Sequence, residues 1–412
     1  MNKIKIVIVG GGFGGVYTAL NLTEIFNDDS IEVTLINKNS HFLFTPLLHE
    51  VATGGLSPNS VIEPLREVFR GTTVKFVEDS VIEINYTSKM VMTGSVSFEY
   101  DYLVIATGAD TNYFGITGAK EHCFNLKTLE DAIVLRKHIL ETCELAVNTK
   151  NKDLLTTAIV GAGPTGVELA AELMEYMQHT LFVYYKSSGF TNEDIRVNIL
   201  TATPDVISQF PQNMRDIAMA ELNKKGIKVI ANTIVTKVEP NLLSFKDGGS
   251  LKAHTIVWVA GVAPYFNNVK GIADVVNISV KNRIETNEFL QSTKYPEVFS
   301  LGDVSGTHPM LAQVAVQQGR IVAENIYALV DKKKLLKFEF MQKGLLLSIG
   351  QWYAIGSFGT GKYSITLRGR LMWWIWRTVY LFNFLSWKKK FEIVGEWTMN
   401  LFYPRDIGRE GF

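Results

Sequence analysis

Two glycine-rich stretches carry the residues whose types and spacing could do chemistry. In the first, Gly10, Gly12 and Gly15 follow a β-branched run at residues 5–9 and precede a helix-forming segment. Glycines at this spacing permit a tight turn, let the backbone approach a pyrophosphate, and let the helix pack on the strand. The N–H groups at the helix start then face the phosphates. We therefore expect a dinucleotide-binding turn here, although a single match would also fit a plain glycine turn.

The second stretch repeats the first, with Gly161, Gly163 and Gly166 offset by 151 residues from Gly10, Gly12 and Gly15. The strand end that closes each half also recurs, at residues 103–108 and 257–261. A duplicated strand-turn-helix unit is a property of a whole fold rather than of one turn. The sequence therefore predicts an α/β protein with two Rossmann-like dinucleotide-binding domains.

The residues expected to bind ribose are not acidic in either half. An Asp or Glu would normally stand at the end of the second strand of each unit. Here the strand at residues 31–36 is followed by Asn37 and Lys38, and the strand at residues 197–200 is followed by Thr201. A flavin dinucleotide tolerates Asn37, because its amide still hydrogen-bonds ribose. The choice between NADH and NADPH stays open.

Two carboxyl groups are candidates for work beside a redox ring. Glu168 opens the helix after the second glycine turn, where a partly apolar site would raise its pKa and let it relay protons. The alternative is a helix-start carboxylate that complements the dipole. Glu172, one turn further on, is expected to face solvent or to pack. Asp303 follows the strand at residues 298–301 and suits a ribityl hydroxyl, or else caps the next helix.

Uncharged groups suggest a site for a quinone. Gln313 and Gln317 stand at i, i+4 on one helix face, which suits a quinone carbonyl, although solvent-facing glutamines would look identical. An apolar loop-to-helix segment at residues 41–55 is expected to be either a wall beside the flavin ring or a packed core helix.

Composition excludes several classes of protein. The chain of 412 residues is long enough for two or three domains, and its 41 basic and 41 acidic residues leave no net charge to attract nucleic acid. Its two cysteines, Cys123 and Cys143, form neither a disulfide framework nor a dithiol motif. We expect no metal site. The first strand begins at about residue 5, which leaves no room for a signal peptide, so the chain is expected to stay in the compartment where it is made.

The C-terminal part is aromatic and basic. A helix at residues 371–387 would be about 26 Å long, short of a hydrocarbon core of roughly 30 Å. Arg377 at its centre would cost roughly 2.5–3.5 kcal/mol in mid-bilayer. Its aromatic side chains and the flanking run Lys388 to Lys390 suit a helix lying in the membrane interface. Burial in a homodimer interface is the alternative.

The domain boundaries follow from these segments. We expect an FAD-binding domain at residues 1–114 and 286–340, an NAD(P)H-binding domain at residues 115–285, and a C-terminal region for membrane association or dimerisation at residues 341–412. The segment at residues 180–198 departs from a minimal βαβ unit and has no assigned role.

With these motifs in view, the chain resembles the type II NADH dehydrogenases, which are single-subunit flavoproteins that oxidise NADH and reduce a membrane quinone. The resemblance runs over essentially the whole length. Its most specific motifs are TPLLHEVATG at residues 45–54, AQVAVQQ at residues 312–318 and the aromatic, basic C-terminus. The glycine turns and the Gly302–Asp303 loop are shared by all flavoprotein reductases with two dinucleotide sites.

The resemblance implies an FAD-dependent NADH:quinone oxidoreductase of respiratory electron transport. Hydride would pass from NADH, or NADPH, to FAD, and two electrons to the quinone, without proton pumping, on the cytoplasmic face of the cell membrane. It places Glu168 beside the meeting point of nicotinamide, flavin and quinone. The residues expected to bind the two dinucleotides are Gly10, Gly11, Gly12, Phe13, Gly14, Gly15, Lys38, Asn39, Val81, Thr107, Gly108, Asp303, Ala312 and Gln313 for FAD, and Gly161, Gly163 and Gly166 for NAD(P)H.

Three other functions remain as alternatives. A disulfide or ferredoxin reductase shares the scaffold, but a disulfide reductase needs a redox cysteine pair near the flavin. A sulfide:quinone reductase needs a cysteine in the late half of the chain, and none follows Cys143. A non-catalytic flavin-binding scaffold would keep the glycine turns without a quinone face.

Overall fold

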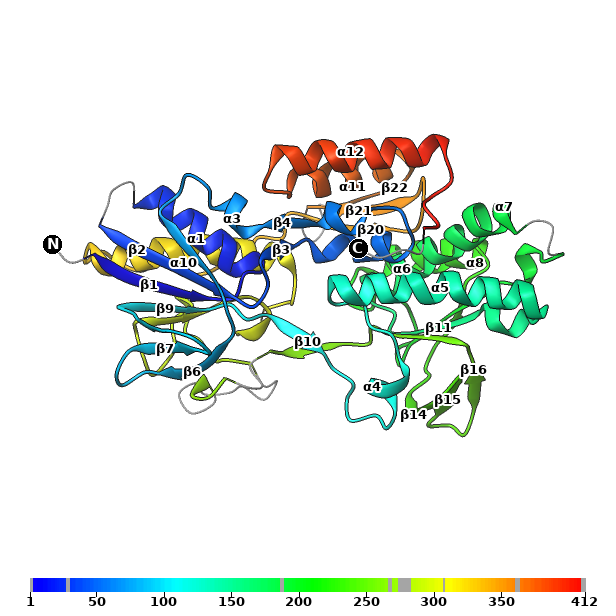
Figure 1. Ribbon diagram of the computed structural model, residues 1–412, viewed down its shortest axis with the longest axis horizontal. Helices are drawn as coiled ribbons and strands as arrows, with labels where there is room; N and C mark the ends of the chain where they lie inside the picture. Colours follow the sequence, from blue (N-terminus) through cyan, green and yellow to red (C-terminus); the bar gives the residue numbers. More distant parts are fainter. Residues whose placement is uncertain are drawn as a thin grey trace. The chain divides into compact units, whose positions relative to one another are not determined.

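A computed structural model describes residues 3–26, 30–185, 189–265, 269–272, 283–306, 308–359 and 364–408 (Figure 1). The chain forms two compact units, each assembled from three segments. Unit 1 comprises Met1–Leu43, Ile62–Asp110 and Ala263–Met341, and unit 2 comprises Phe44–Val61, Thr111–Val262 and Gln342–Phe412. The chain thus crosses near residues 110 and 262, where we expected crossings near 114 and 285. Residues 44–61 and the C-terminal segment both belong to unit 2, which the expected boundaries did not include.

The main sheet of unit 1 has five parallel strands in the order β19-β9-β1-β2-β5. Its central strand, β1, pairs Val9 with Ile36 on one side and with Ile105 on the other. Parallel strands feed their following loops to one edge of the sheet, which is where such folds bind ligands. The strands are β1 (Ile4–Val9), β2 (Ile31–Asn37), β5 (Val74–Glu78), β9 (Tyr102–Ile105) and β19 (Val298–Ser300).

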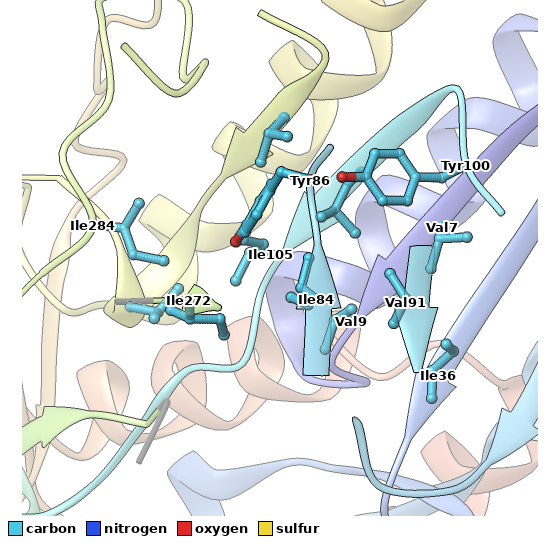
Figure 2. Packing of buried hydrophobic residues seen from close by; sticks show 13 residues of the cluster. Val7, Val9, Ile36, Ile84, Tyr86, Val91, Tyr100, Ile105, Ile272 and Ile284 are labelled. Atoms are coloured by element: carbon cyan, nitrogen blue, oxygen red, sulfur yellow. The ribbon is translucent and has the colours of Figure 1, made fainter. Parts of the chain in front are cut away.

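An antiparallel meander contributes buried side chains to the core cluster of unit 1. Figure 2 shows Val7, Val9 and Ile36 of the main sheet packed with Ile84 and Val91 of the meander. Ile6 to Val9 of β1 are all buried, which is the continuous pattern of a strand covered on both faces. The meander is formed by β6 (Val81–Asn85), β7 (Met90–Thr93) and β8 (Ser97–Glu99).

Two long helices pack against each other in unit 1, α1 (Phe13–Ile25) and α10 (Ala312–Val330). Gly319 allows the close approach, because a Cβ atom there would lie 3.1 Å from the Gly14 carbonyl oxygen and the Thr18 nitrogen. The smaller elements of this unit are β3 (His41–Leu43), β4 (Ile62–Pro64) and α3 (Leu65–Val68). The short strands β10 (Ala109–Thr111) and β18 (Val262–Pro264) stand at the crossings.

Unit 2 repeats the architecture of unit 1. Its parallel sheet has the order β13-β12-β11-β17, and a three-stranded antiparallel meander lies between β13 and β17 in the chain. This repetition confirms the duplication read from the glycines. The strands are β11 (Thr156–Val160), β12 (Arg196–Leu200), β13 (Lys228–Ile230), β14 (Val235–Glu239), β15 (Leu242–Phe245), β16 (Ser250–Lys252) and β17 (Thr255–Trp258).

The helices of unit 2 follow local signals. The start of α5 (Leu129–Thr149) is fixed by Thr128 and Asp131, which form a reciprocal capping box. The helix after the second glycine turn, α6 (Pro164–Glu175), continues as a π-helical segment (Tyr176–Leu181) into the excursion at residues 180–198, of which residues 186–188 lie outside the described part. The remaining helices are α2 (Leu48–Ala52), α4 (Ala119–His122), α7 (Phe182–Tyr184) and α8 (Gln212–Lys224).

The C-terminal segment of unit 2 is richer in structure than the sequence suggested. A three-stranded antiparallel sheet, β20 (Leu345–Ser348), β21 (Ala354–Phe358) and β22 (Ile365–Gly369), packs against α11 (Arg370–Phe382). In Figure 1, α12 (Trp387–Phe402, red) lies over α11. None of the helices within the described ranges is both long enough and apolar enough to cross a membrane.

The prediction of a single helix at residues 371–387 is therefore wrong. The helix ends at Phe382, and a second helix starts after Ser386, whose hydroxyl accepts a hydrogen bond from the Lys389 N–H at 3.3 Å. Serine is a preferred N-cap residue, because its short side chain satisfies an otherwise unpaired N–H group. The prediction followed the run of apolar residues and did not take the Ser386 cap into account.

Candidate functional site

The carboxyl edge of the unit 1 sheet collects most of the residues predicted to bind FAD. The glycine turn at residues 10–15 follows β1, and Lys38 and Asn39 follow β2. Thr107 and Gly108 follow β9, and Asp303 follows β19. Segments far apart in the sequence thus meet at one edge of one sheet, as the spacing arguments required.

The two glycine turns have nearly identical backbone geometry. Gly10 and Gly161 have φ angles of +111° and +118°, which favour glycine. A Cβ atom at Gly15 would collide with the carbonyl oxygen of Gly10, and one at Gly166 with that of Gly161. These four glycines are therefore required by the packing of each turn itself.

Gly12 and Gly163 differ from those four, because an added Cβ would meet no atom within 4 Å. Each is the N-cap residue of the following helix, α1 or α6, and neither helix has a side-chain cap there. The N–H groups at these helix starts are thus left for an anionic ligand, which is the role that the dinucleotide phosphates fill.

Unit 1 also offers polar groups suited to the rest of FAD. The buried Thr107 hydroxyl oxygen has no hydrogen-bond partner among the described residues. The Lys38 ammonium is exposed and lies 5.0 Å from the centre of the Tyr265 ring. Gln318, which the sequence did not single out, is buried and accepts a hydrogen bond from the Gly302 N–H at 2.7 Å, so it fixes the loop that carries Asp303. These groups fit the cofactor.

The two positions expected to bind ribose are occupied by side chains with partners inside the protein. The Asn37 amide accepts a hydrogen bond from the Gly11 N–H and donates one to the Asn39 carbonyl, both at 2.9 Å. The hydroxyls of Thr201 and Thr203 lie 2.7 Å apart. Neither position holds an acid that would repel a 2′-phosphate, so the structure leaves nucleotide preference as open as the sequence did.

The amide of Gln317 is already engaged. Its Nε2 donates to the Met341 carbonyl at 2.9 Å, and its Oε1 accepts from the Met341 N–H at 3.1 Å. Gln313 lies one turn earlier on α10 and is half-buried. Ala312, also expected near the flavin, is the first residue of this helix. The pairing with Met341 gives Gln317 a role in holding the chain where it leaves unit 1.

A row of three carboxyl groups runs along one face of α6 in unit 2. Glu168, Glu172 and Glu175 stand at i, i+4 and i+7, and all three are buried. Of the two positions expected for Glu172, solvent exposure is wrong, and this side chain is packed inside the protein. The three acids share a helix face with small and apolar residues, and that spacing in an otherwise apolar helix was the available signal.

Glu168 has few partners that favour its charged form. Its Oε1 accepts a hydrogen bond from the Ser348 N–H at 3.1 Å, and its Oε2 lies 3.9 Å from Nδ1 of His49. Burial, together with the nearby carboxyls of Glu172 and Glu50, raises the pKa of Glu168 to about 8. Burial also lowers the pKa of His49 to about 4, so this imidazole is neutral. Glu168 is therefore protonated at neutral pH.

The other two carboxyls of α6 are paired with cations. An Arg405 guanidinium nitrogen lies 2.6 Å from Glu172 Oε2, and this charge holds the pKa of Glu172 below its usual range although burial opposes it. The Lys225 ammonium pairs with Glu175, which also accepts a hydrogen bond from the Gln351 N–H at 2.6 Å. These ion pairs compensate charges that would otherwise be costly to bury.

A fourth buried carboxyl faces this row from α2, within the segment considered as a flavin wall or a core helix. All five residues of α2 are buried, which agrees with a packed helix. Glu50 Oε2 accepts a hydrogen bond from the Trp397 indole N–H at 2.7 Å. The Arg377 guanidinium, 3.8 Å from the Trp373 ring centre and 4.5 Å from that of Trp397, is buried between them. Arg377 thus lies within the protein, not in a bilayer.

The described residues include neither a thiolate nor a cluster of metal ligands. Burial raises the pKa of both thiols, Cys123 and Cys143, to about 12, so neither is a thiolate at neutral pH. Within the described ranges, no group of three or more His, Cys, Asp or Glu residues could hold a metal ion.

Comparison with known proteins assigns the chain to a family. Residues 4–319 match the model of the pyridine nucleotide-disulphide oxidoreductases, and residues 342–406 match that of the NDH2 C-terminal domain. The type II NADH:quinone oxidoreductase of Haemophilus influenzae is 30% identical over 91% of this chain and 92% of that protein. The chain belongs to the type II NADH:quinone oxidoreductases. A second type II enzyme, from Mycobacterium tuberculosis, is 30% identical over 97% of this chain and 89% of its own length.

Solved structures agree with the fold of the type II family. NDH2 from Plasmodium falciparum, in complex with NADH, has a TM-score of 0.89 at 22% identity, covering 99% of this chain and 100% of that one. The sulfide:quinone oxidoreductase of Aquifex aeolicus has a TM-score of 0.75 at 22% identity, over 97% of this chain and 95% of that one. The predicted family and its α/β flavoprotein fold are confirmed, and FAD is the cofactor expected for a type II enzyme.

We predict that alanine at the two open glycines separates the two nucleotide sites. Gly12→Ala should lower FAD occupancy, because its methyl group fills space reserved for the pyrophosphate, whereas Gly163→Ala should raise the KM for NADH about tenfold, or ~1.4 kcal/mol, with FAD retained. The unfolding temperatures of the flavin-free proteins should match the parent chain. Gly15→Ala serves as the contrasting variant and should destabilise the fold. Loss of FAD from Gly163→Ala would contradict the assignment.

We also predict that Arg405→Met destabilises unit 2 in a pH-dependent way. Without its cation, buried Glu172 would have a raised pKa in the folded state, so stability should fall as pH rises above the unfolded value of about 4. In the parent chain the pKa of Glu172 is lowered, so the pH dependence is opposite: the stability that the ion pair contributes is lost as the pH falls. Denaturant unfolding at pH 5 and pH 8 should show the larger deficit at pH 8, on the order of 3 kcal/mol.

The double variant Glu172→Gln/Arg405→Met tests the pair directly. Removing both charges should restore much of the lost stability at pH 8, since no uncompensated charge remains buried. Strictly additive losses would show that the two side chains do not act on each other.

Proposed function

We propose that this chain oxidises NADH through bound FAD and reduces a quinone at a membrane surface. The main support is the pair of matching glycine turns, one in each unit. The second glycine of each turn, Gly12 or Gly163, leaves space for one dinucleotide. Family membership supports the same activity. When bound, FAD supplies the two-electron chemistry that links a hydride donor to a quinone. The residues of the chain bind and orient the reactants and handle protons.

Unit 1 is the proposed FAD-binding domain and unit 2 the proposed NADH-binding domain. The expected FAD residues gather at the carboxyl edge of the sheet in unit 1, and Gly161, Gly163 and Gly166 form the turn of unit 2. The alternative of a disulfide reductase has no support from the two cysteines, because both thiols are protonated at neutral pH.

Glu168 is the proposed proton donor. Converting a quinone to a quinol takes two protons as well as two electrons, so the enzyme needs a group that is protonated at neutral pH and able to lose its proton. Glu168 meets both conditions, because burial raises its pKa to about 8 and no cation is paired with it among the described residues. A donor whose pKa lies near the working pH is best matched to proton transfer.

The proposed quinone contacts are Gln313 and Gln317 on α10. Uncharged amides on one helix face can donate a hydrogen bond to a quinone carbonyl without ionising. Gln317 is already hydrogen-bonded to the backbone of Met341, so it would hold the segment around Met341 beside the quinone. Gln313 would make the direct contact with the quinone.

The exposed face of α11 and α12 is the proposed membrane surface. On α12, Phe391, Val394 and Phe402 are exposed while Ile393 and Trp397 are buried, so the helix has apolar side chains on both faces. The exposed apolar residues of the two helices are Leu371, Trp374, Val379, Phe382, Trp387, Phe391, Val394, Met399 and Phe402. Exposed apolar side chains concentrated on two helices that contact each other are typical of a membrane or protein contact.

Basic groups favour a membrane over a second protein chain. Lys388 is exposed, and the Lys390 ammonium lies 4.7 Å from the centre of the Trp387 ring and 5.7 Å from that of Phe382. Aromatic side chains next to ammonium groups suit the boundary between acyl chains and anionic headgroups. We therefore propose peripheral attachment on the cytoplasmic face of the cell membrane, with homodimerisation through the same helices as the second candidate.

Glu168→Gln should slow quinone reduction by about a hundredfold at pH 7, because the amide supplies no proton. FAD content and the bleaching of the flavin by NADH without a quinone should not change. In the parent enzyme, kcat should fall as pH rises through about 8, since the protonated form is the donor. Exposed Glu130→Gln is the control. Parent-like steady-state rates of Glu168→Gln with several quinones would remove this residue from the mechanism.

Phe391→Glu and Phe402→Glu should each weaken binding to vesicles that contain anionic lipid by about tenfold, because they place a charge in the apolar face. Val134→Glu, at an exposed site on α5 of the same unit, is the matched control and should bind normally. Activity with a water-soluble quinone should be unchanged. If these variants convert a dimer to a monomer and leave vesicle binding intact, the dimer interface replaces the membrane surface.

A further inference from the structure

Glu50 is the buried titratable group that the proposed function does not use. It lies on α2, is 4% exposed, and accepts the indole N–H of Trp397. We propose that Glu50 holds a second proton behind Glu168, which it returns to that carboxylate after Glu168 has protonated the quinone. Glu50 would not touch the quinone and would act only through Glu168. The inference therefore rests on the proposed function.

The charges around Glu50 carry the first step. Lys225 neutralises Glu175, and Arg405 neutralises Glu172. The other charged or titratable groups of α2, α6 and α11 that act on the pair are His49, Arg377 and Tyr380, whose pKa is raised by burial so that its phenol stays neutral. His49 is neutral, and the charge of Arg377 acts on Glu50 rather than on Glu168. In this buried cluster Glu168 therefore keeps its proton, and Glu50 binds a second one as the pH falls through its pKa of about 7.

The surroundings of the two carboxyls decide the order in which they lose protons. The charged groups that act on Glu168 are the carboxyls of Glu172 and Glu50, which favour its neutral form. Glu50 is also buried, but Arg377 and the Trp397 N–H stabilise its charged form, and its pKa is raised only to about 7. Each carboxylate raises the proton affinity of the other, so loss of the Glu168 proton draws one toward it from Glu50.

His49 approaches Glu168 and neighbours Glu50 in the chain, so we assign to it the proton transfer between the two carboxyls. It precedes Glu50 on α2, its Nδ1 lies 3.9 Å from Glu168 Oε2, and it is 2% exposed. Its Nε2 has no hydrogen-bond partner among the described residues. A neutral imidazole with one unpaired nitrogen can accept a proton on one side and release one on the other without losing an existing hydrogen bond at that atom.

The steps balance without another redox group. The O–H bond of Glu168 breaks and its proton goes to one quinone oxygen. The hydride of NADH supplies, through the flavin, the two electrons and the second hydrogen of the quinol. The O–H bond of Glu50 then breaks and its proton passes to the Glu168 carboxylate. Water outside the protein restores the proton on Glu50.

A purely structural role is the competing explanation, because the bond between Glu50 and Trp397 ties α12 to the segment at residues 44–61. Glu396 makes a similar tie from the same helix, since it accepts hydrogen bonds from the Ser57 N–H at 2.8 Å and the Ser60 hydroxyl at 2.7 Å. Glu396→Gln is therefore the matched control. Both substitutions remove a carboxyl that fastens the same two segments, but only Glu50 belongs to the charge cluster.

The experiment is an infrared titration of carboxylic acid groups in the FAD-loaded enzyme, without substrates. Compared with the parent enzyme, Glu50→Gln should lose one carboxylic acid component that titrates near pH 7, and the component of Glu168 should titrate at a lower pH, because a negative neighbour is gone. Glu168→Gln assigns the second component. Glu396→Gln should leave the titration unchanged.

Turnover gives the second readout. The fall of kcat with rising pH should begin earlier in Glu50→Gln, so that quinone reduction is about threefold or more slower than in the parent enzyme at pH 8 and within about twofold at pH 6. Equal losses at both pH values, matched by Glu396→Gln, or an infrared titration that superimposes on that of the parent enzyme would overturn the proposal. If the enzyme reduces no quinone, the proposed function fails, and the infrared result still reports whether Glu50 holds a proton.

Discussion

Burying three carboxyl groups on one face of α6 is the constraint on which unit 2 depends. Each carboxyl must find a cation or a hydrogen-bond donor, or else keep a proton, because water no longer solvates it. The partners come from distant parts of the chain, namely Ser348 on β20, Lys225 after α8 and Arg405 after α12. The position of the C-terminal segment within unit 2 follows from this need as much as from hydrophobic packing.

The two units solve one packing problem twice and then differ in chemistry. Both turns need a glycine with positive φ and a glycine whose Cβ would strike a carbonyl oxygen, and both leave the middle glycine open. After the turns the similarity ends. Neither helix has an acid in its first turn, but α1 has an acid only near its C-terminal end, at Glu24, whereas α6 carries the carboxyl row from Glu168 onward. The same strand-turn-helix fold thus builds two dinucleotide sites, and only the site of unit 2 has carboxyl groups nearby on its helix.

Local signals allowed the sequence to predict much of this architecture. Glycine spacing and β-branched runs predicted the two dinucleotide-binding domains with their parallel sheets, because these signals act over a few residues. The break between α11 and α12 was missed because hydrophobicity outweighed the cap at Ser386. The partner of Glu172 could not be predicted, since Arg405 lies 405 − 172 = 233 residues away. The same holds for the return of residues 44–61 to unit 2, which depends on buried polar contacts between distant segments.

The long sequence separation between Glu172 and Arg405 also constrains biosynthesis. A ribosome makes α6 well before it makes the guanidinium that neutralises this carboxylate. Until then, the growing chain must leave the helix hydrated at that face or keep the carboxyl protonated. The last turn of α12 and the residues after it therefore complete unit 2 at a late stage of translation, when the Asp406 side chain can also reach Arg136 on α5.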